Sequence, residues 1–535
     1  IVHQRFLIPG SWRLTFRSID DFSVAQLAER ESVSYLEFVQ VLSSAAIEAT
    51  PSGSPELASL GTLLAHLALL RHLLASASFD HVERKQTFLT LVRLVEHTVG
   101  LIMPVLSSPE DNVVDGNAGA DGEMEGSLAD LLNSRASKEQ LIWCRSWMAS
   151  REICIMIRSL WLAVPPGLHE VFGAGLRRTV DALMDILLRA QHYGSIDSAK
   201  ATLQHICSTR GGALVEDVAT SCVDSLFEYM LRPGQSRRDA IRRSGGMPFG
   251  LQSVMISSPK SRISAMIMER LLVICESPHA GSDVVHWPKV HALNALRLVF
   301  SDPRLSSLER YHGTGFRIVL QCLSDPSWEI QNSAALCFTS LVSSKVMGGG
   351  VANVRRVNHK DVWPARALSA DGFLGRYREV DRFMIDVLER RRADDLLAPV
   401  LALLGRLKPE MAPPGMPSDT KKIGSAGMDA TKHYKDCLMW HLGSPQIYIR
   451  KLAARACVSV VPAISWHCLV SECCDTNKAM TNSDHGHTNL LHGRLCLLVE
   501  VFKALHSLPS HSGDLFSAIA GSFCDAFGNE EVIQR

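Results

Sequence analysis

A dense cluster of arginines lies near the middle of the 535-residue chain. Its members are Arg232, Arg237, Arg238, Arg242 and Arg243. Directly after it come Ser244, Gly245 and Gly246, which are small, and then Met247 and Pro248. Guanidinium groups bind phosphate oxygens through paired donors, and glycines let a backbone or a partner approach closely. The pattern predicts a phosphate-binding surface, and the alternative that these residues leave open is a solvated helix end.

A second basic group lies further along the chain, beside an aromatic residue. It comprises Arg355, Arg356, Lys360 and Arg376, and Trp363 lies among them. Cationic and aromatic side chains together hold single-stranded RNA by charge and stacking. We therefore treat these residues as weaker candidates for RNA binding, against the alternative of a solvated loop and a polar helix face.

The residue types of an active site do not occur in a working arrangement. Gly173-Ala-Gly175 and Gly348-Gly-Gly350 lack the strand, helix and acidic residue that a nucleotide-binding turn needs. Ser244 lacks the Gly-x-Ser-x-Gly frame of a nucleophile elbow. Cys473 and Cys474 are adjacent and not spaced as zinc ligands are. We expect a non-enzymatic protein with no cofactor and no metal.

Composition and periodicity indicate the elements that must position these residues. Hydrophobic residues make up 46% of the chain and aromatic residues 6%, and 55 Lys and Arg balance 55 Asp and Glu, which excludes a globally basic nucleic-acid binder. Leucines recur every three or four positions over 57–77, as one face of a helix requires. The same pattern predicts helices over 85–106, 139–163, 176–191, 214–231, 262–275 and 290–300. We find no alternating strands joined by tight hairpins.

An internal repeat joins two of the helical stretches. Residues 324–335 (SDPSWEIQNSAA) align with residues 443–454 (GSPQIYIRKLAA). Partial copies begin at Val290 and at Ile241, the latter ending in Gly245-Gly246. In both full copies a capping side chain precedes a proline that we expect at the first helical position. The pattern resembles the HEAT repeat and predicts an all-α, HEAT/armadillo-like helical-repeat solenoid with long loop insertions.

Breaks in the periodicity predict the domain organisation. The expected segments are N-terminal repeats over 1–106, an acidic disordered loop over 107–132, a central region over 133–405, a Pro- and Gly-rich linker over 406–434, and C-terminal hairpins over 435–535. No uninterrupted apolar run reaches about 18 residues, so we expect no membrane span. The 14 cysteines without a CxxC pair favour reduced, buried thiols in the cytosol or nucleus, and we expect a cytoplasmic protein. Because the chain opens with Ile1, we expect a fragment of a longer protein.

The arginine motif resembles a signature of the THADA family. Arg242-Arg-Ser-Gly-Gly-Met-Pro248 is similar to Arg-Arg-Ser-Ala-Gly-Ile-Pro, with glycine in place of alanine and methionine in place of isoleucine. Val290-His-Ala-Leu-Asn294 and Trp328-Glu-Ile-Gln-Asn-Ser-Ala334 resemble two further stretches of the family, with Gln331 where the family has arginine. Family positions are also matched by Arg376, Tyr377, His492 and Gly493.

The resemblance implies a function. Members of this family are large helical-repeat proteins, and they are the non-catalytic partners of an FtsJ-like tRNA 2′-O-methyltransferase that modifies nucleotide 32 of the anticodon loop. It implies a scaffold or regulatory subunit whose partners are this enzyme and the tRNA anticodon stem-loop. The implied residues for tRNA or partner binding are Arg237, Arg238, Arg242, Arg243, Ser244, Gly245, Gly246 and Pro248. The alternative from another class is a general HEAT-repeat adaptor that binds proteins and not RNA.

Overall fold

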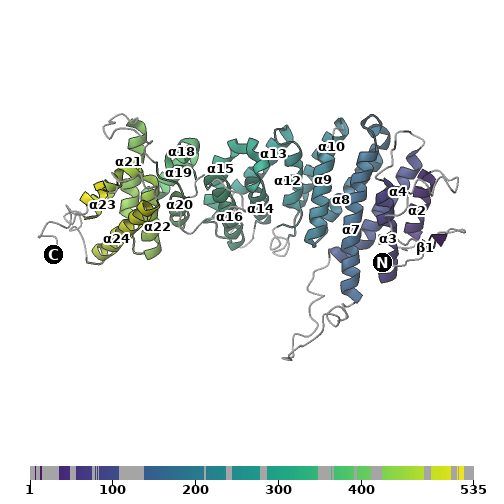
Figure 1. The fold of residues 1–535 in the computed structure, drawn as a ribbon, viewed down its shortest axis with the longest axis horizontal. Coiled ribbons are helices and arrows are strands. Elements are labelled where there is room, and N and C mark those ends of the chain that lie inside the picture. Colours follow the sequence, from purple (N-terminus) through teal and green to yellow (C-terminus); the bar gives the residue numbers. More distant parts are fainter. Residues whose placement is uncertain are drawn as a thin grey trace, which may run out of the picture. The chain divides into compact units, whose positions relative to one another are not determined.

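Helices make up nearly all the regular structure in the described part of the computed structural model (Figure 1). The described residues are 6–7, 13–14, 35–48, 56–74, 79, 81, 84–107, 138–209, 212–235, 244–277, 286–347, 363, 367–390, 395–410, 425–474, 484–507, 515 and 517–522. Within them, the two-residue strands β1 (Phe6–Leu7) and β2 (Arg13–Leu14) pair antiparallel. The chain divides into two units, residues 1–267 and residues 268–535. The prediction of an all-α helical-repeat protein is confirmed.

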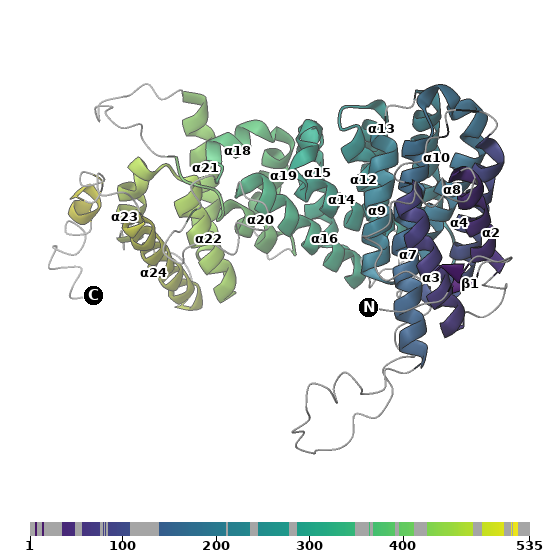
Figure 2. The ribbon, with the colours of Figure 1, turned by 45° about the vertical axis from the view of Figure 1, so that its right-hand side comes forward.

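The helices of the first unit form two layers, which can be followed in Figure 1 and Figure 2. One layer contains α3 (Leu57–Leu74), α7 (Lys138–Ala163), α9 (Tyr193–Ser208) and α12 (Met247–Ser257). The other contains α2 (Tyr35–Glu48), α4 (Lys85–Leu106), α8 (His169–Arg189) and α10 (Ala213–Leu231). The short η2 (Pro166–Leu168) precedes α8, and α13 (Arg262–Glu276) begins in this unit. Successive helices therefore alternate between layers, as stacked helical hairpins do.

Polar contacts establish the order and direction of α7, α9 and α12. The contacts, each between 2.7 and 3.2 Å, are Ser150 with Ser195, Thr202 with the Cys154 carbonyl, Ser253 with the Lys200 carbonyl and Ser257 with the Gln204 carbonyl. From one contact to the next, the residue numbers rise in both helices of each pair. The three helices therefore run parallel. The first turns of α9 and α12 therefore lie at one edge of this layer.

α4 is a core helix of the first unit. By length and composition alone it is long and apolar enough to cross a membrane, and the core helix of a protein can pass the same test. Arg93, Glu96 and His97 interrupt its apolar run, and the expectation that the chain has no membrane span stays a prediction. In the structure 61% of its most apolar window is buried, and it packs against α2, α7 and α8. Burial inside the unit accounts for its apolar character.

The second unit repeats the two-layer arrangement of hairpins. One layer contains α14 (Trp287–Ser301), α16 (Trp328–Leu341), α20 (Leu397–Leu404), α22 (Ile447–Val460) and α24 (Asp484–His506). The other contains α15 (His312–Cys322), α19 (Arg378–Glu389), α21 (Ser425–His441) and α23 (Trp466–Cys474). The shorter helices are η3 (Pro303–Tyr311), η4 (Val342–Val346), α18 (Ala370–Arg376) and η5 (Ala463–Ser465). The rings of Phe316, Phe373 and Tyr377 pack with centroids 5.0 to 5.6 Å apart in the core.

The segment boundaries differ from those expected. The division after residue 267 falls inside the central region expected over 133–405. Helix α21 begins at Ser425, inside the linker expected over 406–434, so this connection is shorter than its composition indicated. The acidic loop expected over 107–132 lies outside the described residues except for its first position.

The two full copies of the repeat begin with equivalent hydrogen bonds. The Asp325 carboxylate accepts from the Ser327 N–H at 3.0 Å, and the Ser444 hydroxyl oxygen accepts from the Gln446 N–H at 3.3 Å. Each bond spans a proline, which has no N–H to donate. Helices α16 and α22 consequently begin two residues after the prolines that we expected at their first positions.

The small residues of the repeat are used differently in each copy. Ala453-Ala454 are both buried in α22, whereas in α16 Ala334 is buried and Ala335 is exposed. Gly245-Gly246 lie in the turn before α12 and not on a helix, so the helical copy expected from Ile241 is wrong at this pair. Ile241 itself lies outside the described residues.

Candidate nucleic-acid interface

The structure describes five of the predicted binding residues, namely Ser244, Gly245, Gly246, Pro248 and Arg376. The others, Arg237, Arg238, Arg242, Arg243, Arg355, Arg356 and Lys360, lie outside the described residues and stay predictions. The structure does define the frame on both sides of the arginine motif. This frame consists of the end of α10 before the motif and the turn into α12 after it.

The chain after Arg243 makes a tight turn in the left-handed backbone conformation. Ser244 has a φ of 69° and Gly245 a φ of 59°, whereas Gly246 returns to −83° and immediately precedes α12. A positive φ is uncommon for a residue with a Cβ and costs Ser244 about 1 kcal/mol. Ser244 is nevertheless buried, with 4% of its surface exposed. The surrounding structure therefore holds this turn in place.

Gly246 lies directly against the last turn of α8. A Cβ at this position would stand 1.8 Å from the carbonyl oxygen of Leu187, too close for any side chain. One turn later, a Cβ on Gly250 would stand 2.8 Å from a methyl of Leu187 and 2.9 Å from a methyl of Leu226. Pro248, between the two glycines, is also buried. These residues let α12 approach α8 and α10 closely, and they attach the motif to the scaffold.

The other side of the frame is the C-terminal end of α10. The Gln235 side chain donates to the carbonyls of Met230 and Arg232 at 2.6 and 2.9 Å. The Arg232 guanidinium lies 4.0 Å from the centroid of the Tyr229 ring. Such contacts satisfy carbonyls that a helix end leaves open and place a cation where the helix dipole favours one. Arg232, which the sequence groups with the basic cluster, therefore interacts with its own helix.

Aromatic residues that the sequence analysis did not single out gather at the starts of α9 and α12. Tyr193, the first residue of α9, is 64% exposed, and its ring centroid lies 6.1 Å from that of Phe249 in the first turn of α12. Lys200, two turns along α9, places its ammonium 4.9 Å from the Phe249 ring centroid. No motif links these residues in the sequence, so only the packing of α9 on α12 reveals the group.

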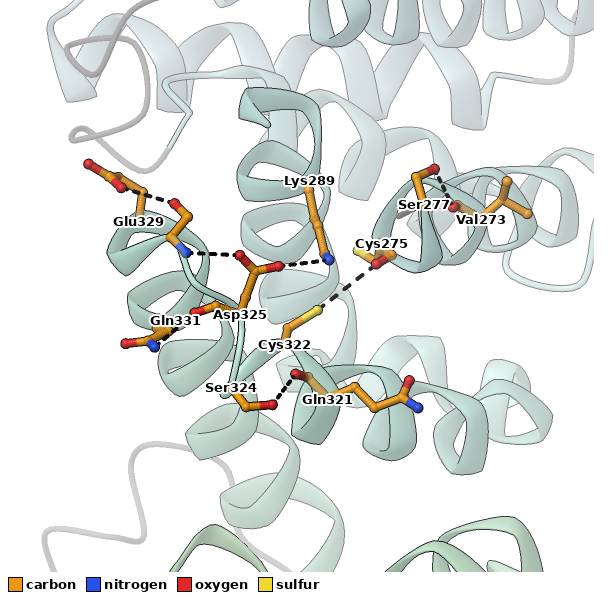
Figure 3. A network of polar contacts seen from close by, with 11 residues as sticks. Val273, Cys275, Ser277, Lys289, Gln321, Cys322, Ser324, Asp325, Glu329 and Gln331 are labelled. Carbon is orange, nitrogen blue, oxygen red and sulfur yellow. Dashed lines mark hydrogen bonds and ion pairs between the residues drawn. The ribbon is translucent and has the colours of Figure 1, made fainter. Parts of the chain in front are cut away.

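A buried ion pair joins α14 to the start of α16 (Figure 3). Lys289 Nζ lies 3.1 Å from Asp325 Oδ2, and both side chains are nearly inaccessible. Gln331 donates to the Asp325 carbonyl at 2.8 Å, and Cys322 lies 4.0 Å from the Cys275 carbonyl. Burial raises the pKa of the Cys322 thiol to about 11, which keeps it neutral at physiological pH. These contacts hold the hairpins of this unit together.

Comparison with known families decides what kind of scaffold this is. A family model described as THADA/TRM732, DUF2428 matches residues 86–329, and a model for the C-terminal TPR repeats of Trm732 matches residues 331–501. The chain belongs to the THADA/Trm732 family. A HEAT-repeat model also matches residues 316–344, which include the later part of α15 and the whole of α16.

Relatives in the THADA/Trm732 family are similar over about half of this chain. A mouse protein named tRNA (32-2′-O)-methyltransferase regulator THADA is 26% identical over 262 residues, which are 47% of this chain and 13% of the relative. The Drosophila melanogaster protein of that name is 26% identical over 329 residues, 54% of this chain and 18% of the relative. The Schizosaccharomyces pombe protein named tRNA (32-2′-O)-methyltransferase regulator trm732 is 25% identical over 274 residues, 49% of this chain and 18% of the relative. This chain thus matches less than a fifth of the length of each.

One solved structure of an engineered protein aligns with 88% of this chain and 99% of its own, at 15% identity and a TM-score of 0.28. A likeness at that level supports no argument about the fold. The assignment of the fold as a helical repeat rests on the family matches and on the observed helical hairpins.

The THADA-family position Arg376 lies in a pocket of mixed charge. The pocket, of about 490 Å³, is lined by Glu309, Arg310, Gly313, Thr314, Gly375, Arg376, Tyr377, Arg378 and Glu379. Arg376 forms an ion pair with Glu309, and Tyr377 beside it belongs to the aromatic core. The carboxylates in this pocket compete with phosphate for the guanidiniums. Arg376 stays a weaker candidate for RNA binding.

The other two matched positions join α24 to the rest of its unit. His492 Nδ1 accepts from Arg450 Nε at 3.1 Å. A Cβ on Gly493 would stand 2.0 Å from the carbonyl oxygen of Leu442 at the end of α21. Arg450 also donates to the Ser444 carbonyl at 2.6 Å, just as Gln331 donates to the carbonyl of Asp325 in the first copy. Glutamine in place of the family's arginine at position 331 therefore makes the same hydrogen bond.

Proposed function

We propose that this chain is part of a non-catalytic scaffold and regulatory subunit for tRNA ribose 2′-O-methylation at nucleotide 32 of the anticodon loop. Its partners are an FtsJ-like methyltransferase and the tRNA anticodon stem-loop, and it works in the cytoplasm without a cofactor of its own. The observation that carries the proposal is the family match over residues 86–329, which includes the whole arginine motif. Relatives that match about half of this chain are named as regulators of a tRNA (32-2′-O)-methyltransferase.

The anchored turn after the motif supports a role in holding tRNA. Arg242 and Arg243 immediately precede Ser244, whose buried left-handed turn is pressed on α8. The turn that follows the two arginines in sequence is thus fixed on the scaffold, and guanidinium groups bind phosphates through paired donors. Contacts to phosphates position a nucleic acid without reading its sequence. The scaffold then holds the anticodon loop while the partner enzyme supplies the active site.

The first prediction concerns the arginine pair. Replacing both residues (Arg242→Ala with Arg243→Ala) abolishes methylation of nucleotide 32, because two phosphate-binding groups are lost, and leaves the protein folded. The measurement is mass spectrometry of tRNA from cells in which the variant is the sole source of the protein. The matched control removes two exposed positive charges, one in the α12–α13 turn and one at the first residue of α13 (Lys260→Ala with Arg262→Ala), and keeps methylation.

Normal methylation in the arginine variant would contradict the role proposed for the motif. Normal methylation in cells that lack the protein would contradict the proposed function. Measuring the direct binding of the protein to an anticodon stem-loop distinguishes a tRNA scaffold from a protein-only adaptor. A tRNA scaffold loses affinity steeply as salt rises, because bound phosphates release counterions, whereas a protein-only adaptor does not bind the RNA.

A further inference from the structure

The first turn of α9 displays Tyr193 outward because its chain neighbours are held inward. His192 lies against the indole rings of Trp143 and Trp147, with ring centroids 4.7 and 5.0 Å away. A Cβ on Gly194 would stand 2.5 Å from Trp147 Nε1, so Gly194 lies flat on α7. With both neighbours fixed, the backbone of Tyr193 has little freedom left to lose. An exposed ring on such a backbone is preorganised for binding.

The second ring of the group gives Tyr193 a firm support. Phe249 meets it at an interplanar angle of 73°, the edge-to-face geometry that aromatic pairs favour. Lys200 lies over the Phe249 ring, within the range of a cation–π contact. Phe249 is half-buried, so the surface that remains open to a ligand belongs to Tyr193.

The charges beside the rings are balanced. Lys200 is the nearby cation, and Asp197, which is exposed, lies one helical turn after Tyr193 on α9. This helix face therefore carries one charge of each sign near Tyr193. Binding at Tyr193 therefore depends on contact with the ring face and not on net charge.

We propose that Tyr193, supported by Phe249 and flanked by Lys200, is a stacking platform for an unpaired base of a single-stranded RNA loop. This inference rests on the proposed function, which brings an anticodon loop to the unit. Unstacked bases of RNA loops stack on exposed aromatic side chains, whatever their identity, since every base has a π-face. Phe249 follows Gly246 by three residues, so the platform and the arginine motif adjoin along the chain. Together they match the two parts of a nucleotide, its base and its phosphate.

RNA fits this surface better than a protein partner does. A tyrosine that anchors a protein–protein interface is surrounded by tightly packed residues that exclude water. Tyr193 has instead the charged side chains of Asp197 and Lys200 on its own helix face, and charged groups are depleted from the cores of protein interfaces. An exposed aromatic ring flanked by a cation is an arrangement that binds single-stranded nucleic acid.

The test measures the affinity of the full-length protein for a fluorescently labelled anticodon stem-loop at several salt concentrations. Tyr193→Ala weakens binding about tenfold at every concentration and leaves the salt dependence unchanged, because stacking releases no counterions. Tyr193→Phe restores the affinity, since it keeps the ring. The arginine variant (Arg242→Ala with Arg243→Ala) has the opposite signature, a shallower dependence on salt. The matched control is Tyr448→Ala, another exposed tyrosine in the first turn of a helix, which keeps wild-type affinity.

A second readout reports stacking directly. The fluorescent base 2-aminopurine, placed in the loop, is quenched on binding to the wild-type protein and to Tyr193→Phe, and is not quenched by Tyr193→Ala. Wild-type affinity of Tyr193→Ala, with a weakened arginine variant, overturns the platform and leaves the proposed function standing. An equal loss in Tyr448→Ala also overturns the platform, because the effect is then not specific. If the wild-type protein does not bind the RNA at all, both proposals fall.

Discussion

At the scale of single residues, two glycines show why a motif position requires one residue type. Gly246 faces the Leu187 carbonyl oxygen at the end of α8, and Gly493 faces the Leu442 carbonyl oxygen at the end of α21. In both places one helix approaches the backbone of another so closely that no Cβ fits. A backbone oxygen cannot move aside as the end of a flexible side chain can. The small residue in each motif is therefore required by helix packing, and the charged residues before Gly246 are left for binding.

A comparison of neighbouring glycines tests this explanation. Gly246→Ala lowers the free energy of unfolding by about 3 kcal/mol or more, because its Cβ collides with a backbone oxygen and α12 must shift. Gly245→Ala costs only about 1 kcal/mol, because its Cβ meets no atom within 4 Å and the penalty comes from its positive φ alone. Chemical denaturation followed by circular dichroism measures both. Equal costs for the two variants would contradict the role given to the Leu187 carbonyl.

At the scale of elements, the start of each repeat helix is organised around a proline. The residue before the proline accepts a backbone hydrogen bond with its side chain, and its own carbonyl receives a side-chain donor from the first turn of the helix. That donor is Gln331 in α16 and Arg450 in α22. Both donors are long enough to reach back over the proline, and both satisfy a carbonyl that the helix itself does not use. The repeat position is thus explained by a hydrogen bond, which either residue type provides.

Substitutions at position 331 distinguish this bond from a role for charge. Gln331→Met removes the donor and lowers the free energy of unfolding by about 1 kcal/mol, whereas Gln331→Arg keeps it and leaves stability close to wild type. Thermal or urea unfolding of the two variants measures the difference. A stable methionine variant would show that the bond to the Asp325 carbonyl contributes nothing.

At the scale of the whole molecule, the formal charge is zero, with 55 basic and 55 acidic residues, yet buried groups still couple stability to pH. His312 in the second unit is 4% exposed and packs against Phe300, with ring centroids 5.7 Å apart. Burial lowers the pKa of His312 to about 3, and the positive charge of Lys345 contributes in the same direction. The ring is therefore neutral in the folded protein at physiological pH. Unfolding releases it to its ordinary pKa of about 6.5.

This difference makes the second unit sensitive to acid. Between pH 6.5 and 3 the unfolded chain binds a proton that the folded chain does not, so stability rises with pH in this window. The contribution of His312 is complete above pH 6.5, and as pH falls below it stability decreases by up to about 1.4 kcal/mol per pH unit. Urea unfolding at pH 7, 6 and 5 shows a smaller acid loss in His312→Gln than in wild type. The exposed His506→Gln serves as the control, and an acid loss in His312→Gln as large as in wild type would refute the assignment.

Much of the fold follows from patterns along the chain. The periodicity over 85–106 and 214–231 predicts α4 and α10 almost to the residue, because a helix is formed by contacts between residues three and four positions apart. The alignment of 324–335 with 443–454 predicts that both begin a repeat helix, and α16 and α22 do so. Composition was a poorer guide at the edges of elements, since the polar and Pro-rich stretch over 406–434 contains the start of α21.

What the sequence by itself determined is therefore the set of helices, their repeat and the motif that marks the family. The tertiary structure alone decided that Gly246 lies on a carbonyl of α8, that Gln331 serves the turn before its own helix, and that Tyr193 and Phe249 form one aromatic surface. The physical reason is distance along the chain. Periodicity records interactions among near neighbours, whereas a surface assembled from two helices exists only once those helices pack, and no local pattern encodes which of their residues will meet.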